Sequence, residues 1–373
     1  MPIYKMNGKK DGKQQYRVRI NYTDASGKAK QIDRVAYGSA EAKDLEQKLQ
    51  REIKEKPISS GITVQQLFDE YMGVKKHEVR ETTLKQTQNV LTIHILPLLK
   101  TVRINDLNNK LLQSWKSQIS GNSSLSLKTK QNIYKEFRAM LNYAVKMDYL
   151  PKNPLSNLGN FKDVYFEVPK DKLQYYTPEQ FKKYIACARE NCTTLTDWGY
   201  YVFFSIAYYT GMRKGEINAL KWSDIEGNTI HVRRSIAQKL KGEDRETPPK
   251  NKSSYRDLQM PLPLIDILKE HKARYQQLEG FTEEFRICGG VRCLRDTSLE
   301  NKNKQFAEKA NLPHIRIHDF RHSHASLLAN EGINIQEIAR RLGHSKIEMT
   351  WNTYSHLYPR EEERAVQILN KIV

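Results

Sequence analysis

The sequence predicts a mostly α protein with small β-sheets, an α+β chain of three domains. Apolar residues recur at helical spacing through most of the 373 residues, and alternating segments typical of strands gather in two places. Two polar, proline-containing stretches interrupt the pattern. We therefore expect domains at residues 1–56, 62–155 and 173–373, joined by linkers at 57–61 and 156–172.

The charge balance is the clearest global property of the chain. Lys and Arg number 62 against 43 Asp and Glu, a formal net charge of +19. An excess of this size favours a polyanionic partner, most simply nucleic acid. The 4 cysteines are too few for a disulfide scaffold, and we expect no bound metal or cofactor. No signal peptide or membrane-spanning segment is visible, so we expect a cytoplasmic protein without a membrane partner.

Residues 1–56 are expected to form a three-stranded sheet backed by one helix. Apolar and basic residues alternate along Tyr16–Tyr22, and a return strand is expected at Ile32–Ala36 after a turn, with a first strand near Ile3–Met6. The exposed face would carry Arg17 and Arg19, and such a face can enter a DNA major groove. The alternative is two solvated surface arginines.

Residues 62–155 are expected to form four helices. Thr63 and Gln66 make a capping box for the first, and Pro97 is expected to stop the second. The long fourth helix, Leu127–Tyr149, carries basic residues that suit contacts to a DNA backbone: Lys128, Lys130, Lys135 and Arg138. An ordinary solvated helix face is the alternative.

Residues 173–373 combine helices with one small sheet. The nearly all-apolar segment Asp197–Tyr209 must be a core helix. A small antiparallel sheet is expected from Ile230–Val232, Ser235–Leu240 and Tyr255–Met260. Further helices are expected at Arg213–Leu220, Leu264–Leu278, Ser298–Ala310, Ile317–Asn330, Ile335–Leu342 and Glu361–Val373.

Five side chains in this last region suit the chemistry of a phosphate diester. A diester gains negative charge in its transition state, which planar, permanently charged guanidinium groups can bind. A tyrosine with an ordinary pKa near 10 needs a positive field or a base before it can attack. The five residues lie in the motifs T-G-M-R-K-G-E-I, H-D-F-R-H, L-G-H-S and N-T-Y-S-H: Arg213, His318, Arg321, His344 and Tyr354.

The order and local context of these motifs resemble the signature of the tyrosine recombinases, the phage integrase family. The ten-residue step from His344 to Tyr354 agrees as well. The three-part layout resembles the longer members, integrases of temperate phages and integrative conjugative elements with an N-terminal arm-binding domain. The resemblance implies an arm-binding domain at 1–56, a helical, SAM-like core-binding domain at 62–155 and a catalytic domain at 173–373 with a small antiparallel sheet.

The resemblance also implies roles for single residues. Arg213 and Arg321 would bind the non-bridging phosphate oxygens, and Tyr354 would be the nucleophile, with Tyr358 its nearest rival. His318 is the better base candidate, because it shares a helix face with Arg321, and His344 would hydrogen-bond a phosphate oxygen. Glu216 is expected to orient Arg213 or to cap local structure, whereas His322 and His324 are interpreted as packing residues.

The general acid of the family is a lysine on a β-hairpin. The segment Pro249–Ser253 resembles that turn, with Asn251 where threonine is frequent. Lys250 is our choice, and Lys252 stays open as the acid or as a DNA contact. A zinc site at His318 and His322 is a rival interpretation, which the neighbouring Arg321 disfavours.

The implied reaction is site-specific recombination through a 3′-phosphotyrosyl link and a Holliday junction, which integrates or excises a mobile element. The implied partners are double-stranded DNA at core and arm attachment sites, three further copies of the chain in a tetramer, an excisionase and a host DNA-bending protein. The segment 361–373 would dock on a neighbouring copy. A type IB topoisomerase and a catalytically silent DNA-binding protein are the alternatives.

Overall fold

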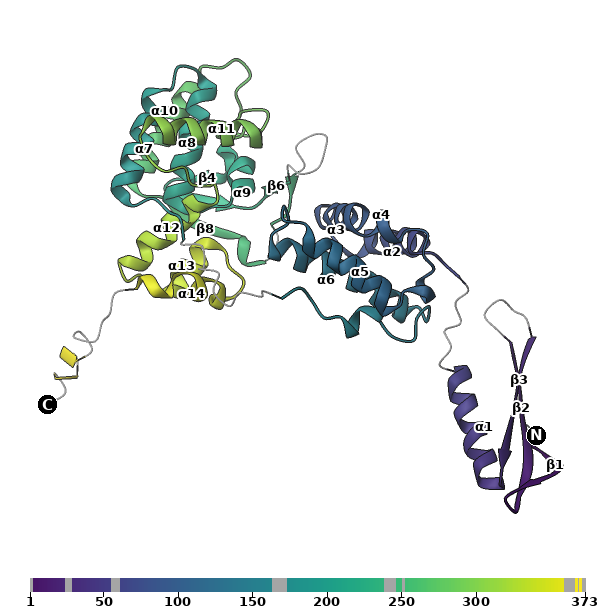
Figure 1. The fold of residues 1–373 in the computed structure, drawn as a ribbon. Coiled ribbons are helices and arrows are strands. Elements are labelled where there is room, and N and C mark those ends of the chain that lie inside the picture. The colour runs from purple at the N-terminus through teal and green to yellow at the C-terminus, as the bar shows by residue number, and fades with distance from the viewer. Residues whose placement is uncertain are drawn as a thin grey trace. The chain divides into compact units, whose positions relative to one another are not determined.

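The computed structural model describes residues 3–23, 29–54, 61–162, 173–237, 246–249, 252–358, 366–367 and 369–370. The chain divides into two compact units, Met1–Val168 and Pro169–Val373 (Figure 1). Helices predominate and the sheets are small and antiparallel, which confirms the expected α+β class. None of the helices in these ranges is both long enough and apolar enough to cross a lipid bilayer.

The first unit begins with a three-stranded antiparallel sheet covered on one face by a helix (Figure 1). Val18 and Ala36 of the sheet are buried against Ala42 and Leu49 of the helix. Because side chains alternate along a strand, Arg17 and Arg19 lie on the opposite face. The elements are β1 (Ile3–Lys10), β2 (Lys13–Thr23), β3 (Ala29–Tyr37) and α1 (Ser39–Lys54).

The rest of the first unit is a helical bundle with its own core. Trp115 and Phe137 pack edge to face within this core, and the indole of Trp115 donates to the carbonyl of His94. The capping box at Thr63 and Gln66 is present. Pro97 lies near the start of a short extra helix rather than just after a stop. The helices are α2 (Val64–Glu78), α3 (Glu81–His94), α4 (Leu96–Leu99), α5 (Asn109–Gly121) and α6 (Leu127–Lys146).

The second unit is built around one buried helix, α8. Its residues Phe203 and Phe204 are wholly buried, and Phe204 contacts Tyr184, Phe306 and Phe320 from three surrounding elements. The helices are α7 (Pro178–Glu190), α8 (Leu195–Thr210), α9 (Lys214–Ala219), α10 (Leu262–Tyr275), α11 (Asp296–Lys309), α12 (Asp319–Asn330), α13 (Ile335–Leu342) and α14 (Ile347–Tyr354).

The small sheet of this unit differs from the expected one. Its order is β4-β5-β8, formed by β4 (Ile225–Glu226), β5 (Thr229–Val232) and β8 (Arg256–Gln259). Ser235–Leu240 was also expected to be a strand of this sheet, but its described residues, 235–237, do not join it. Its first two residues, β6 (Ser235–Ile236), pair instead with β7 (Glu246–Thr247).

The reason is that β5 already has a partner on each side. The tight turn at Gly227, whose φ is +54°, lets Ile225 pair with Ile230, and β8 pairs with the other edge. Two further predictions cannot be compared with the fold. Lys250 and most of the last helix expected at Glu361–Val373 lie outside the described residues.

Candidate active site

The C-terminal end of α13 collects three arginine side chains. Its carbonyl groups at positions 341, 342 and 343 each accept a hydrogen bond from a different guanidinium. In that order the donors are Arg256 at 2.6 Å, Arg321 at 2.6 Å and Arg213 at 3.2 Å. The carbonyl end of a helix carries partial negative charge and therefore attracts cations. It brings together arginines from β8, from α12 and from the residue before α9.

Two glycines shape this meeting point. Gly343 ends α13 and Gly211 ends α8, both in the left-handed region with φ of +65°. A Cβ on Gly343 would lie 3.1 Å from Nη1 of Arg256, and one on Gly211 would lie 2.7 Å from the ring of His324. The carbonyl of Gly211 also accepts from Nη1 of Arg321 at 2.8 Å. The missing Cβ at each glycine therefore leaves room for a neighbouring side chain, and the carbonyl of each glycine accepts a hydrogen bond from an arginine.

The carboxylate of Glu216 lies between two of the arginines. It is 2.9 Å from Nη1 of Arg213 and 2.9 Å from Nη2 of Arg256, and it also accepts the backbone N–H of Arg213. Burial alone would raise the pKa of Glu216, but the two guanidinium groups outweigh it and the pKa is lowered. Glu216 thus contacts Arg213 as we expected from the sequence.

Arg256 was missed by the sequence analysis, although the pattern held a signal. Arg256 and Leu258 lie two residues apart on the buried face of β8, between exposed residues. An arginine on the buried face of a strand needs a charged or hydrogen-bonding partner. Arg321 is 3% exposed, and burial followed by repulsion from Arg213 lowers its pKa to about 9. The carboxylate of Glu216 contacts two of the guanidinium groups, Arg213 and Arg256, and acts on the third, Arg321, through its charge. The excess positive charge is complementary to a phosphate anion.

The two predicted histidines lie beside these arginines. His318 precedes α12 as its N-cap, so the helix begins two residues later than expected. The first residue of the helix is Asp319, whose carboxylate accepts a hydrogen bond from the backbone N–H of Arg316. Desolvation and the charge of Arg321 lower the pKa of His318. Because His318 is exposed, water reduces the size of both effects. Nδ1 of His344 is 2.7 Å from Oγ1 of Thr350, and burial and Arg321 lower its pKa to about 4.

Tyr354 ends α14 and is 2% exposed. Its hydroxyl oxygen lies 2.6 Å from Nδ1 of His322, and burial raises its pKa to about 12. The rival Tyr358 is committed elsewhere, because its hydroxyl donates to the carbonyl of Ile333 at 2.6 Å. The interpretation of His322 as a packing residue missed its contact with Tyr354. His324 is a buried residue as expected and contacts the carbonyl of Tyr208.

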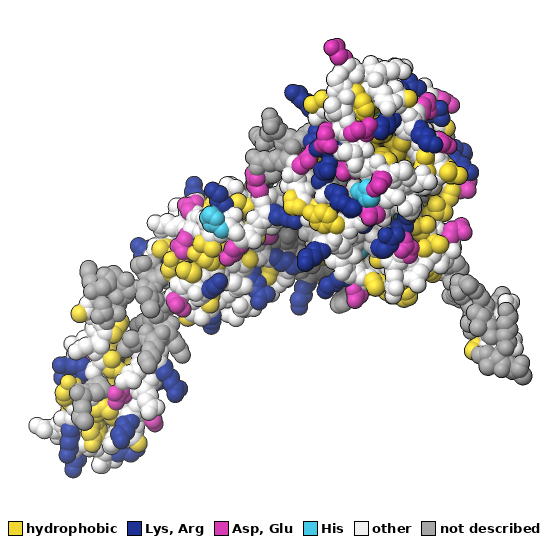
Figure 2. Space-filling view, turned by 180° about the vertical axis from the view of Figure 1, so that it is seen from behind, with side chains coloured by type: hydrophobic (Ala, Val, Ile, Leu, Met, Phe, Trp, Pro, Cys, Tyr) yellow, Lys and Arg dark blue, Asp and Glu magenta, His cyan; other side chains and the backbone are white. Residues whose placement is uncertain are grey.

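The remaining predicted site residues are dispersed. Lys and Arg side chains are spread over the described surface among fewer acidic ones (Figure 2). Arg17 and Arg19 both pair with Asp33, at 3.4 and 3.0 Å. Nζ of Lys130 donates to the carbonyl of Ser120 at 2.7 Å. The others are exposed: Lys128, Lys135, Arg138 and Lys252.

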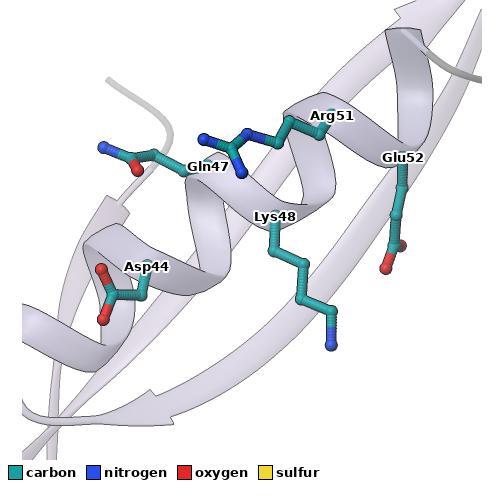
Figure 3. Close-up of a pocket in the computed structure, with 5 residues that line it drawn as sticks. All are labelled: Asp44, Gln47, Lys48, Arg51 and Glu52. Atoms are coloured by element: carbon teal, nitrogen blue, oxygen red, sulfur yellow. The ribbon is translucent and has the colours of Figure 1, made fainter.

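A hollow on α1 holds none of the predicted site residues. It has a volume of about 460 Å³ and is lined by the polar side of this one helix (Figure 3). Its lining residues are Asp44, Gln47, Lys48, Arg51 and Glu52. Side chains of a single exposed helix give no enclosed set of groups for chemistry, so the arginine cluster at α13 is the candidate active site.

Comparison with known families identifies the family of the chain. Residues 174–361 match the Phage integrase family, and residues 63–119 match the phage integrase N-terminal SAM-like domain. The chain belongs to the phage integrase family. It is a tyrosine-type site-specific DNA recombinase, which confirms the resemblance drawn from the motifs and leaves the topoisomerase and silent-protein alternatives without favour.

Individual relatives agree with this assignment. The ICEBs1 integrase of Bacillus subtilis is 26% identical over 97% of this chain and 98% of its own length. A "Tyrosine recombinase XerC-like" protein of Caldanaerobacter subterraneus is 30% identical, over 74% of this chain and 72% of its own.

Solved structures share the fold. The Tn1549 transposon integrase in complex with circular intermediate DNA has a TM-score of 0.66 at 19% identity, over 84% of this chain and all of that one. A lambda integrase tetramer bound to a Holliday junction has a TM-score of 0.59 at 16% identity, over 97% of both chains.

Proposed function

We propose that this recombinase cuts each DNA strand by attack of Tyr354 on the scissile phosphate. The hydroxyl oxygen of Tyr354 forms a 3′-phosphotyrosyl bond and the 5′ oxygen leaves as a hydroxyl. The bond energy stays in the phosphotyrosyl link, so strands are rejoined without ATP or a metal ion. The observation that carries the proposal is the meeting of three arginines at the end of α13, with electrostatic coupling between Arg321 and Tyr354.

Each charged group has a role that fits its place. The side chain of Arg213 is 35% exposed and can donate directly to a non-bridging oxygen. The buried guanidinium of Arg321 adds positive charge to the site. Because Nδ1 of His344 is engaged by Thr350, its Nε2 is the nitrogen left to donate to a phosphate oxygen. Their hydrogen bonds to backbone carbonyls hold the arginines in place before DNA arrives, which lowers the cost of binding the transition state.

Lys250 is proposed as the general acid that protonates the departing 5′ oxygen. A substrate with sulfur in the 5′ bridging position tests this, because a thiolate leaves without a proton. Lys250→Ala should cleave the normal duplex about 100-fold more slowly and the sulfur-containing duplex at the unmodified rate. Lys252→Ala is the matched control. If Lys252→Ala alone shows this pattern, Lys252 is the acid.

The first unit is proposed to hold the DNA. Residues 1–56 would bind arm sites through Arg17 and Arg19, and residues 62–155 would follow the core-site backbone through Lys128, Lys135 and Arg138. Lys130 is less suited, because it already contacts Ser120. The similarity to a lambda integrase tetramer on a Holliday junction supports assembly of four copies, with 361–373 docking on a neighbour.

The similarity to the ICEBs1 integrase supports integration and excision of a mobile element in a bacterial cytoplasm. An excisionase and a host DNA-bending protein are the proposed further partners. Sequencing the DNA that flanks the gene would supply the attachment sites needed as substrates.

A nicked duplex that carries such a site tests the nucleophile, since the short 5′ fragment diffuses away and traps the covalent protein–DNA adduct. The adduct should form with the wild type and with Tyr358→Phe and disappear with Tyr354→Phe. An adduct that survives Tyr354→Phe would refute the proposal.

A further inference from the structure

His322 joins α12 to the end of α14. Its Nδ1 lies 2.6 Å from the hydroxyl oxygen of Tyr354, and the two ring centroids are 5.8 Å apart. His322 follows Arg321 directly, so the two side chains leave the helix about 100° apart. Arg321 points to the carbonyls of Gly211 and Leu342, whereas His322 reaches the nucleophile. One short segment of α12 therefore supplies a buried cation and a separate contact to Tyr354.

The protonation of this pair follows from its surroundings. Burial and the nearby charges of Arg321 and Arg316 lower the pKa of His322 against the opposing effect of Asp319. Burial raises the pKa of Tyr354 to about 12. Near neutral pH both groups are uncharged, so the phenol O–H donates and Nδ1 accepts. The proton of the nucleophile already points at the atom that can receive it.

We infer that His322 is the catalytic residue that takes the phenol proton of Tyr354 as the tyrosine attacks. The inference rests on the proposed function. In the cleavage step the bond between the tyrosine oxygen and phosphorus forms and the bond from phosphorus to the 5′ oxygen breaks. The phenol proton passes to Nδ1 of His322, and the departing oxygen takes a proton from the general acid. In rejoining, the imidazolium of His322 returns its proton to the tyrosine oxygen.

This inference changes the role that the sequence suggested for His318. Among the described residues, it is His322 that is placed within hydrogen-bond distance of the Tyr354 hydroxyl. The exposed ring of His318 lies edge-on to that of His322, with centroids 5.4 Å apart, next to Arg321. His318 is thereby placed to meet the phosphate, while Arg321 stabilises the negative charge that develops on the tyrosine oxygen.

Single-turnover cleavage of the nicked attachment-site duplex tests the inference in the full-length protein. His322→Ala removes the acceptor, whereas His322→Asn keeps a hydrogen-bond acceptor near the position of Nδ1 but cannot take the proton. His356→Ala, at an exposed histidine two residues after Tyr354, is the matched control. Anisotropy with the intact duplex measures DNA binding, and thermal unfolding checks the fold.

Both His322 variants should cleave about 100-fold more slowly at pH 7 with unchanged DNA affinity. Their rates should rise about tenfold per pH unit between pH 6 and 8, as the fraction of ionised tyrosine grows. The wild-type rate should instead level off above the lowered pKa of His322. The sulfur-containing duplex should not rescue either variant, because it removes the need for an acid and not for a base.

Three results would overturn the inference: a loss below about threefold in His322→Ala, wild-type rate and pH profile in His322→Asn, or rescue by the sulfur-containing duplex. Loss of the adduct in Tyr354→Phe together with any of these would leave the proposed nucleophile intact. An adduct in Tyr354→Phe would refute the proposed function itself.

Discussion

The two units of this protein hold their arginines in opposite surroundings. On the first sheet, Arg17 and Arg19 have side chains 42% and 40% exposed and share one carboxylate, Asp33. At the end of α13, Arg256 and Arg321 are 6% and 3% exposed and are held by backbone carbonyls. Salt and water weaken the ion pairs of exposed arginines, so their side chains can change partners when a ligand binds. Buried arginines are held in one position, and removal of a partner leaves their charge uncompensated and destabilises the folded protein.

The largest effect should come from removing the carboxylate of the buried cluster. Glu216→Ala leaves Arg256 without its charged partner and should destabilise the second unit by about 3–5 kcal/mol. Hydrogen exchange of the α9 and α13 amides in the full chain measures this loss locally. Glu279→Ala, at an exposed glutamate, should change exchange little. Equal protection of these amides from exchange in both variants would mean that loss of a carboxylate destabilises the buried cluster no more than it destabilises the surface.

The buried histidines should make the second unit sensitive to acid. Desolvation lowers the pKa of His324 to about 3 and that of His271 to about 4, from an ordinary value of 6.5. The unfolded chain therefore binds more protons below pH 6.5, and stability present above that pH falls as the pH drops towards 4. Each histidine should contribute a slope of about 1.4 kcal/mol per pH unit.

Urea unfolding at pH 7.5, 6 and 5 measures this slope. His324→Asn retains a donor to the carbonyl of Tyr208 and should reduce the slope by the share of one histidine. An unchanged slope in this variant would contradict the assignment of acid sensitivity to His324.

Gly343→Ala should show how tightly the arginines are packed. The left-handed φ of +65° costs a side chain about 1–2 kcal/mol, and the new Cβ also meets Arg256 and the carbonyl of Ser253 at 3.1 Å. Gly227→Ala carries a similar strain at φ +54° with nothing within 4 Å. The greater loss in Gly343→Ala, measured by urea unfolding, isolates the effect of crowding. Equal losses would show that the guanidinium groups move aside freely.

The smallest stability effect is expected on the exposed sheet. Arg17→Ala and Arg19→Ala should each change the free energy of unfolding by less than about 1 kcal/mol, since exposed ion pairs contribute little. DNA binding should respond differently. Each substitution should lower the slope of log affinity against log salt by about 1 if its arginine contacts a phosphate of an arm site. A slope equal to the wild type in both variants would remove these residues from the DNA-binding face.

The sequence analysis succeeded where a pattern is local. Alternation of Tyr16–Tyr22 predicted β2, capping residues predicted the start of α2, and the apolar run at 197–209 predicted the buried helix α8. It failed for the sheet around β5, because strand pairing depends on which edges are already occupied.

The sequence by itself determined the residue types that phosphate chemistry needs, their order along the chain, and the family to which the chain belongs. Only the tertiary structure decided how these residues meet. Arg256 joins the cluster because β8 turns it inward onto Glu216, and His322 meets Tyr354 because the end of α14 packs on α12. Helical spacing determines neighbours within one helix, whereas contacts between helices depend on how their faces pack in three dimensions.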